Sequence, residues 1–348
     1  MNKSVKARYL IPALLCLLAL VALGYYYLFT PFSGGKETTY VYIDEDDNYD
    51  SLMTKLDPIA QRHCYHAFST LSRHSSLVDR VRAGRYEIGS SVGTFTLFRR
   101  IKNGLQTSMD LVVPSVRTME DLAGRLGAKL MLDSAELVKA FKDEAVCRKY
   151  GYDTLTLPAL FIPNTYDIYW TVSLDRFMEY MQKENKKFWN EERTMKAERL
   201  KLSPVEITTL ASIVDEETAN NEEKPMVAGM YYNRLMLRNA EYPDGMPLQA
   251  DPTIKFAWKQ FGLKRVYNKL LFIDSPYNTY RYPGLPPGPI RVPSVAGIDA
   301  VLNMVHHDYI YMCAKEDFSG THNFARTYQE HLGNAHRYAV ALNQHGIK

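Results

Sequence analysis

The chain has 348 residues, of which 46% are hydrophobic and 12% are aromatic, and its 42 basic and 39 acidic side chains leave a formal net charge of +3. So many apolar residues and so small a charge imbalance exclude an intrinsically disordered protein, and at roughly 100–200 residues per domain the length predicts two domains. Because Lys3, Lys6 and Arg8 account for the whole surplus, the remainder is balanced, which argues against a nucleic-acid partner.

The first predicted element is a membrane anchor at residues 9–29, an apolar run without a formal charge. As a helix this run would rise about 31 Å, which is enough to cross a hydrocarbon core of roughly 30 Å. The basic residues before it predict that residues 1–8 are cytoplasmic, so the rest lies on the extracytoplasmic (periplasmic) side of the inner (cytoplasmic) membrane. The alternative is a cleaved signal peptide, since Ala22 and Gly24 are small; the anchor is favoured because the run continues to Phe29.

A small α+β module is predicted at residues 38–106, after a short flexible linker at residues 30–37. It contains two expected strands and three expected helices, at residues 38–43 and 84–88, and at 49–56, 59–71 and 94–102. Asn103-Gly104 is expected to close the last helix, because glycine readily adopts the backbone conformation that ends helices.

The rest of the chain begins with an expected strand at residues 109–113. Capping-box-like spacing at residues 118–121 and 133–136 predicts two further helix starts. The three cysteines beyond the anchor are widely separated, so they are interpreted as free or buried thiols rather than as a disulfide framework. His331 and His336 are five residues apart, a spacing that suits no zinc motif, and no metal or cofactor is predicted.

A helix that carries three consecutive acids is predicted to begin at residues 203–206 (SPVE), which supply a cap, a proline at the first helical position and a glutamate at the third. Side chains at helical spacing then predict one continuous buried face, formed by Ile207, Leu210, Ala211, Val214 and Thr218. At about 100° per residue, Glu216 is expected to point away from this face into solvent.

Glu217 is the acid with apolar neighbours on both sides, because it falls between Ile213 and Leu210 on the helical wheel, whereas Asp215 falls among hydroxyl side chains. Burial beside apolar groups and the negative pole of a helix carboxyl end both raise the pKa of a carboxyl group. A raised pKa lets the acid keep its proton near neutrality and give it to a leaving oxygen, so Glu217 is predicted to be a general acid. The alternative is an exposed acidic helix end.

Residues 210–218 (LASIVDEET) resemble the catalytic helix of the MltG (YceG-like) endolytic murein transglycosylases. The likeness continues in the family's order through blocks at residues 227–235, 248–253, 277–280, 284–290 and 321–324. Weaker matches lie upstream at residues 83–86 and 161–166. Together these blocks are specific, although no single block would be.

The resemblance implies an α+β fold of three parts, a transmembrane anchor at residues 9–29, a LysM-like module at 38–106 and a lysozyme-related α+β catalytic region at 107–348 with core motifs at 203–332. Two departures from the family pattern stand out. Asn164 occupies a position where the family often has an aspartate, and residues 237–247 lengthen the loop before Gln249. The longer loop puts the shape of the cleft in question, but not the chemistry.

The resemblance also implies the reaction, in which Glu217 protonates the glycosidic oxygen between MurNAc and GlcNAc. Glu217 then takes the proton of the MurNAc 6-hydroxyl, which closes a 1,6-anhydro ring, so nascent glycan strands are cut internally and their elongation ends. Six residues are candidates for substrate binding by motif match and hydrogen-bonding capacity: Gln249, Tyr277, Asn278, Tyr280, His322 and Asn323. For Asn278, which follows Pro276, the alternative is turn chemistry.

The implied partners are peptidoglycan glycan strands and the membrane, with peptidoglycan synthases as a further candidate. One alternative function is a catalytically silent peptidoglycan-binding scaffold of the cell-wall synthesis machinery, in which Glu217 is dispensable. Another is a hydrolase, for which Asp215 and Asp251 could supply the pair of carboxylates that ordinary glycosidases use.

Overall fold

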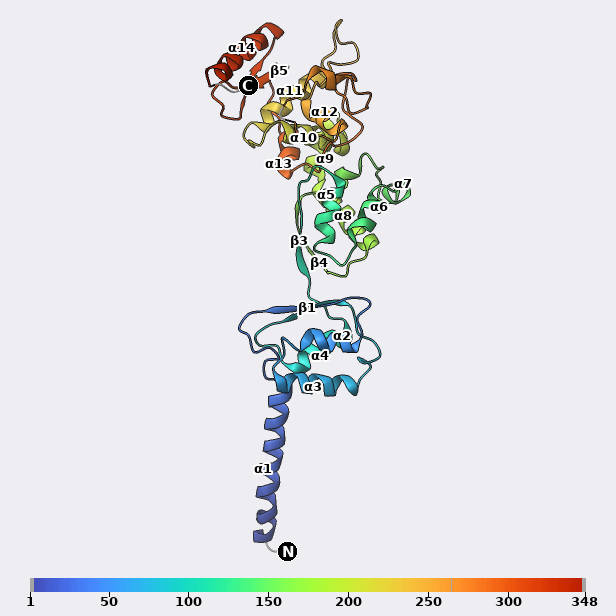
Figure 1. Cartoon of the computed structure of the whole chain (residues 1–348), viewed down its shortest axis with the longest axis vertical. Helices are drawn as coiled ribbons and strands as arrows, with labels where there is room; N and C mark the ends of the chain where they lie inside the picture. Colours follow the sequence, from blue (N-terminus) through green and yellow to red (C-terminus); the bar gives the residue numbers. More distant parts are fainter. Residues whose placement is uncertain (1–2, 264, 346–348) are drawn as a thin grey trace. The chain divides into compact units, whose positions relative to one another are not determined.

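The computed structural model describes residues 3–263 and 265–345, with mixed helix and sheet behind an N-terminal apolar helix. The chain divides into two compact units, which are described separately below (Figure 1). Unit 1 comprises Met1–Leu111, Lys129–Leu132 and Tyr166–Val172. Unit 2 comprises Val112–Ala128, Asp133–Thr165 and Ser173–Lys348.

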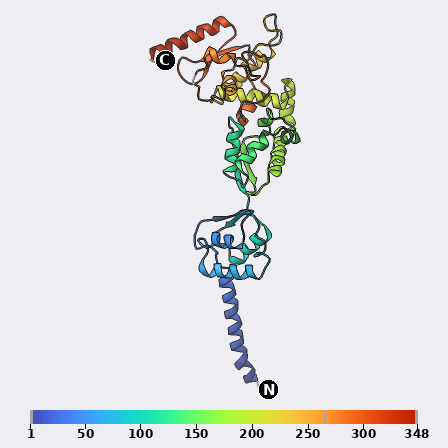
Figure 2. The same cartoon turned by 45° about the vertical axis from the view of Figure 1, so that its right-hand side comes forward.

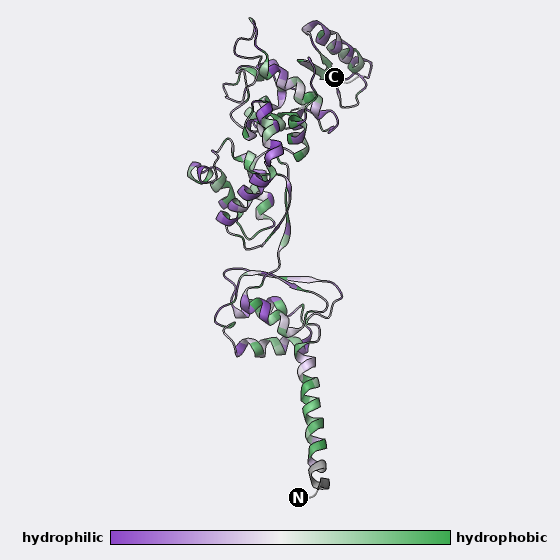
Figure 3. Ribbon diagram, turned by 180° about the vertical axis from the view of Figure 1, so that it is seen from behind, coloured by the Kyte–Doolittle hydropathy of each residue, from purple (hydrophilic) through white to green (hydrophobic). Residues whose placement is uncertain are grey.

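The apolar helix α1 spans Lys3–Leu28. Its segment Tyr9–Leu28 has a mean hydropathy of 2.1 and is not buried against the rest of the protein, and Figure 3 shows most of the helix in the green of hydrophobic residues. A helix of this length and composition is compatible with a single membrane crossing.

The prediction of a short flexible linker at residues 30–37 is wrong for the start of this segment, around Phe32. Phe32 is completely buried in the core of unit 1. Its N–H donates to the Val92 carbonyl at 2.8 Å, and its carbonyl accepts from the Gln61 N–H at 2.7 Å. The segment after α1 is therefore packed and hydrogen-bonded, because burying the large apolar ring of Phe32 stabilises the fold.

The folded module of unit 1 pairs β1 with β2 in an antiparallel sheet, with Thr39 opposite Ile88, and adds three helices. The element bounds are β1 Thr39–Ile43, α2 Tyr49–Leu56, α3 Arg62–Arg73, β2 Gly84–Ile88 and α4 Thr94–Asn103. The helix predicted from residue 59 begins later, because Gln61 is extended and uses its N–H to reach Phe32. Gly104 closes α4 in the left-handed conformation, φ 69°, as predicted.

Helix α3 lies across the end of α1 in both Figure 1 and Figure 2. Ring contacts join the end of α1 to the folded part of unit 1. Tyr26 stacks on His63 with ring centroids 4.1 Å apart, and Phe29 contacts Phe95 at 6.1 Å. Aromatic rings thus pack the folded part of unit 1 against the end of α1.

Strand β3 (Met109–Val113), as predicted, pairs with β4 (Asn164–Ile168) in a two-stranded sheet. The predicted caps are confirmed, since Thr118 accepts from the Asp121 N–H and Asp133 from the N–H groups of Ala135 and Glu136. The remaining elements are α5 Met119–Gly127, α6 Ser134–Phe141, α7 Glu144–Lys149, η1 Leu157–Leu160, α8 Leu174–Phe188, α9 Glu191–Arg199, α10 Pro204–Glu217, α11 Lys224–Met236, α12 Asp251–Ala257, η2 Asn268–Phe272, α13 Val295–Leu302, β5 Tyr311–Ala314, β6 His322–Ala325 and α14 Tyr328–Gln344.

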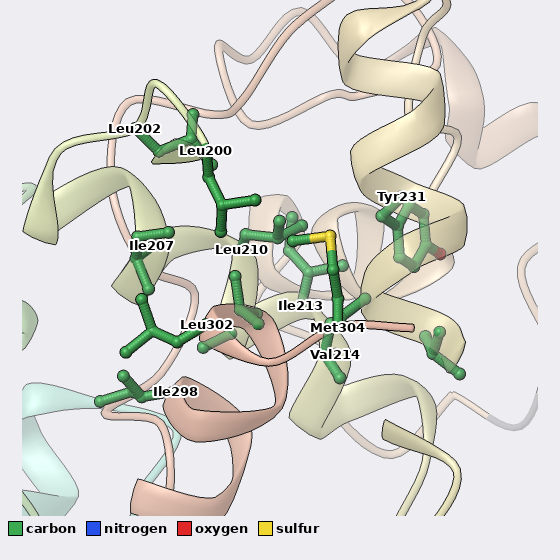
Figure 4. Packing of buried hydrophobic residues seen from close by; sticks show 14 of the residues in the cluster. Leu200, Leu202, Ile207, Leu210, Ile213, Val214, Tyr231, Ile298, Leu302 and Met304 are labelled. Carbon is green, nitrogen blue, oxygen red and sulfur yellow. The ribbon is translucent and has the colours of Figure 1, made fainter. Parts of the chain in front are cut away.

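Helix α10 begins at the predicted capping box of Ser203 and Glu206, but it is buried on every side rather than along one face. Figure 4 shows its side chains packed against α13 and the segment that precedes α10. The buried hydroxyls of Thr208 and Thr209 donate to carbonyls four residues earlier, at 2.7 and 2.8 Å. Because these hydroxyls are satisfied within the helix, α10 can occupy the middle of the core.

Candidate active site

Glu217 is the last residue of α10 and is only partly exposed, with its carboxyl group in a strongly desolvated position. Burial raises its pKa to about 7, and the neighbouring charge of Asp251 acts in the same direction. A hydrogen bond from Tyr231 and the charges of Lys255 and Arg234 lower the pKa and so limit the rise. The carboxyl group is therefore poised to exchange a proton near neutral pH.

Tyr231 on α11 donates its hydroxyl proton to Glu217 Oε1 and is the closest polar partner of this carboxyl group. The ring is almost completely buried, and Figure 4 shows it beside the cluster that contains Ile213 and Val214. Burial raises the pKa of Tyr231 well above its usual value, so it stays a donor across the physiological range. Tyr231 is not among the site residues predicted from the sequence, although it lies within a family-like block 14 positions after Glu217.

Asp251, Tyr280 and Arg234 complete the polar surroundings of Glu217. Tyr280 donates to Asp251 Oδ1 at 2.6 Å, and Asp251 is the first residue of α12. The buried Arg234 donates to the carbonyls of Leu248 and Ile310, at 2.5 Å each, and so ties the loop before α12 to the segment before β5. The structure thus places Tyr280 within the network around Glu217.

Gln249 lies two residues before Asp251, with its side chain exposed and its backbone at a left-handed φ of 50°. Its N–H donates to the Thr279 carbonyl at 3.0 Å, and the Ala250 N–H donates to the Thr279 hydroxyl. These bonds hold a backbone conformation that is unfavourable for a non-glycine residue and present the Gln249 amide at the surface beside the site.

Tyr277 and Asn278 occupy buried positions. Tyr277 packs against Phe256 with ring centroids 4.7 Å apart, and burial raises its pKa to about 12. The Asn278 amide donates to the carbonyls of Leu271 and Ile273, at 2.8 and 2.9 Å, and its oxygen accepts from the Tyr280 N–H. The structure therefore gives Asn278 the turn role, and its sugar binding stays a prediction.

His322 and Asn323 on β6 have acidic partners of their own. His322 contacts the buried Glu223 through its backbone N–H at 2.5 Å and through Nδ1 at 3.1 Å. Asn323 donates to Glu316 at 2.6 Å. Among the described residues no interaction joins either side chain to Glu217 directly, so their substrate binding also stays a prediction.

The expectation of a solvated Glu216 is wrong. Its side chain is only 11% exposed and accepts from Arg117 Nε at 2.8 Å and from Arg291 Nη1 at 2.6 Å. The helical wheel correctly placed this side chain away from the apolar stripe of α10. It could not identify the residues that cover the side chain, because Arg117 and Arg291 lie 99 and 75 residues away in the sequence.

Asp215 is a structural residue. It forms a buried ion pair with Lys224 at 2.8 Å and accepts from the Ser294 N–H and hydroxyl at the start of α13. A carboxylate held in this way cannot activate a water beside Glu217, so the hydrolase alternative loses one of its two candidate partners and keeps only Asp251.

Comparison with known proteins agrees with these features. The YceG-like family matches residues 41–337. The chain is 36% identical over 144 residues to an endolytic murein transglycosylase of Bacillus subtilis, which covers 41% of this chain and 37% of the relative. It is 27% identical over 320 residues to one of Streptococcus pneumoniae strain D39, which covers 81% of this chain and 55% of the relative.

The chain thus spans about half or less of the length of these curated relatives. A crystal structure of a YceG-like protein from Listeria monocytogenes is also similar, with 27% identity and a TM-score of 0.54, covering 86% of this chain and 99% of that one. Since the family match extends over most of both units, the chain belongs to the YceG-like family.

Proposed function

We propose that this protein is an endolytic peptidoglycan lytic transglycosylase, a lyase that cleaves MurNAc–GlcNAc bonds in nascent strands and leaves 1,6-anhydroMurNAc ends. The observation that carries this proposal is the buried carboxyl group of Glu217, whose pKa of about 7 suits proton transfer in both directions. The names of the relatives support the choice of murein as substrate and of cleavage within the strand.

In the proposed reaction the proton of Glu217 passes to the glycosidic oxygen as the bond from that oxygen to MurNAc C1 breaks. The MurNAc 6-hydroxyl oxygen then bonds to C1, and its proton returns to Glu217, so the enzyme ends in its starting state without consuming water. The hydroxyl of Tyr231 stabilises the carboxylate that exists between these two transfers. One carboxyl group with a near-neutral pKa therefore suffices.

The predicted binding residues divide by position. Gln249 and Tyr280 lie beside the Glu217 network and are proposed to contact the sugars first. Tyr277 is proposed to supply an aromatic wall, while Asn278 contributes by shaping the turn that carries Tyr280. Contacts by His322 and Asn323 would come from a more distant part of the strand.

The finer domain assignment is also part of the proposal. The sheet and helices of unit 1 support a LysM-like module at residues 38–106. A catalytic glutamate at the end of a buried helix supports a lysozyme-related catalytic region at 107–348 with its core at 203–332. We place this region on the periplasmic side of the inner membrane, held by α1, where synthases that make nascent strands are candidate partners.

The test of the function is mass spectrometry of sacculi digested by the full-length protein in detergent. The expected products end in 1,6-anhydroMurNAc. Reducing MurNAc ends would instead favour a hydrolase that pairs Glu217 with Asp251, and an absence of new ends would favour the non-catalytic scaffold.

Replacing Tyr231 by Phe is expected to raise the pKa of Glu217 above about 7, because a donor that stabilises the charged carboxylate is lost. Activity requires protonated Glu217, so its decline at alkaline pH should move upward by roughly one pH unit, and the maximal rate should fall about tenfold because the intermediate carboxylate loses a partner. The measurement is the pH profile of glycan cleavage.

The matched control is Tyr232→Phe, since the Tyr232 hydroxyl donates to the Leu200 carbonyl at 3.1 Å instead. This variant should keep the profile of the wild-type protein. An identical profile for Tyr231→Phe would show that Tyr231 does not control the proton of Glu217.

A further inference from the structure

Unit 2 contains a cavity of about 620 Å³, a volume in the range that small-ligand sites occupy. Its walls come from the start of α5, the end of α6, the end of α12 and the segment just before α13. It is connected to the catalytic helix through Arg117 and Arg291, which line the cavity and bind Glu216, the neighbour of Glu217.

The cavity wall carries a surplus of positive charge. Four cations line it, Arg117, Lys142, Lys259 and Arg291, whereas Glu120 is the acid among the lining residues. Glu120 pairs with Lys142 at 2.7 Å, and Glu216 pairs with the two arginines. Four positive charges against these two carboxylates leave two, so an anionic occupant would be attracted.

Two of these cations, Arg291 and Lys259, differ in how they are held. Arg291 uses Nη1 for Glu216 and Nη2 for Ser115, but its buried Nε has no hydrogen-bond partner in the described part of the chain. Lys259 follows α12, is exposed, has a left-handed φ of 53°, and forms no ion pair in the described part of the chain. Its charge is therefore available to an occupant of the cavity.

Another part of the cavity wall is apolar and aromatic, and it is formed by Phe141, Phe256, Phe261 and Tyr277. Phe256 contacts both Tyr277, at 4.7 Å, and Phe261, at 6.4 Å. An occupant that fits must therefore combine carboxylates with small apolar groups. In a strand that carries its peptides, the lactyl carboxyl group of each MurNAc is consumed in the amide bond to the peptide, so the free carboxylates of the strand lie on the peptides, beside methyl groups.

We infer that this cavity binds the acidic peptide attached to the murein strand, so that the protein selects strands that still carry their peptides. The inference rests on the proposed function, because it takes murein as the substrate. The cations hold the peptide carboxylates, and the aromatic wall covers the alanine methyl group. Arg117 and Arg291 bind Glu216, so the proposed peptide site contacts the end of α10 that carries Glu217.

The test uses the full-length protein in detergent with the double variant Lys142→Gln and Lys259→Asn, in which asparagine tolerates the left-handed backbone at position 259. Two readouts are compared. The first is kcat/KM on peptide-bearing strands and on strands stripped of peptides by an amidase, in which the only carboxylate is the lactyl group that the amidase frees on each MurNAc. The second is NMR titration with N-acetyl-L-alanyl-γ-D-glutamate and with its uncharged diamide. The matched control is Lys139→Gln, an exposed lysine on α6, the helix that ends just before Lys142.

The wild-type protein should prefer peptide-bearing strands and bind the dipeptide more tightly than the diamide. In the double variant, the kcat/KM ratio between the two strand types and the affinity ratio between dipeptide and diamide should each fall about tenfold. Its cleavage of stripped strands should stay unchanged, and the Lys139→Gln control should behave like the wild-type protein. Equal handling of both strand types by the wild-type protein, or no change in the double variant, overturns the inference and leaves the lyase proposal intact. If neither strand is cleaved, the lyase proposal fails and the titration alone decides whether the cavity binds the peptide.

Discussion

Glu217→Gln is expected to lower the rate of glycan cleavage by about 1,000-fold, because glutamine keeps the shape of the side chain but can neither donate nor recover the proton. The amide oxygen of the introduced glutamine would still accept a hydrogen bond from Tyr231, so the local packing should persist. The measurement is the rate at which 1,6-anhydroMurNAc ends appear, with the thermal midpoint of unfolding as a check that the fold is retained.

The matched control for this variant is Glu222→Gln, which changes an exposed glutamate five residues further along the chain. It should cleave at the wild-type rate. Substantial residual activity in the Glu217→Gln protein would contradict the single-acid mechanism. It would make Asp251, the neighbouring carboxylate, the next candidate for the general acid.

Lys224→Met is expected to lower the free energy of unfolding by about 3–5 kcal/mol, because it leaves the Asp215 carboxylate buried without its countercharge. Both side chains of this pair are deeply buried, at 7% and 3% exposure, and their nitrogen and oxygen are 2.8 Å apart. Since Asp215 also binds the start of α13 through Ser294, the end of α10 should loosen and activity should fall with stability. The measurement is equilibrium unfolding in denaturant.

Two further variants separate the contribution of the ion pair to the free energy of unfolding from the contribution of packing. Asp215→Asn combined with Lys224→Met removes both charges and should lose less stability than Lys224→Met alone. Lys196→Met breaks a solvent-accessible pair with Glu192 and a hydrogen bond to Asn303, and it should cost about 1 kcal/mol or less. A loss for Lys224→Met as small as that for Lys196→Met would show that Asp215 finds water or another donor.

Helix α10 shows how three adjacent acids can differ in burial and in their charged partners. Asp215 is neutralised by Lys224, and Glu216 by Arg117 and Arg291, so each has a full countercharge. Glu217 instead has a neutral hydroxyl partner and the like charge of Asp251 nearby. Burial raises the pKa of Glu217, the charge of Asp251 adds to this rise, and the neutral hydroxyl of Tyr231 only limits it, so Glu217 is the candidate acid.

The local sequence determined the features that depend on neighbours along the chain. The apolar run predicted α1, the Ser203 capping box predicted the start of α10, and Gly104 predicted the end of α4. Helical periodicity also singled out Glu217, because a side chain's apolar flanks follow from residues three or four positions away.

Only the tertiary structure decided the partners that come from other elements. It brought Tyr231 to Glu217, covered Glu216 with two arginines, and packed Phe32 into a core where a flexible linker was predicted. The physical reason is that capping and periodicity act within one or two helical turns, whereas desolvation and ion pairing depend on which distant segments pack together. The sequence therefore selected Glu217 as the candidate acid, and the packing of α10 against its neighbours set the proton affinity of its carboxyl group.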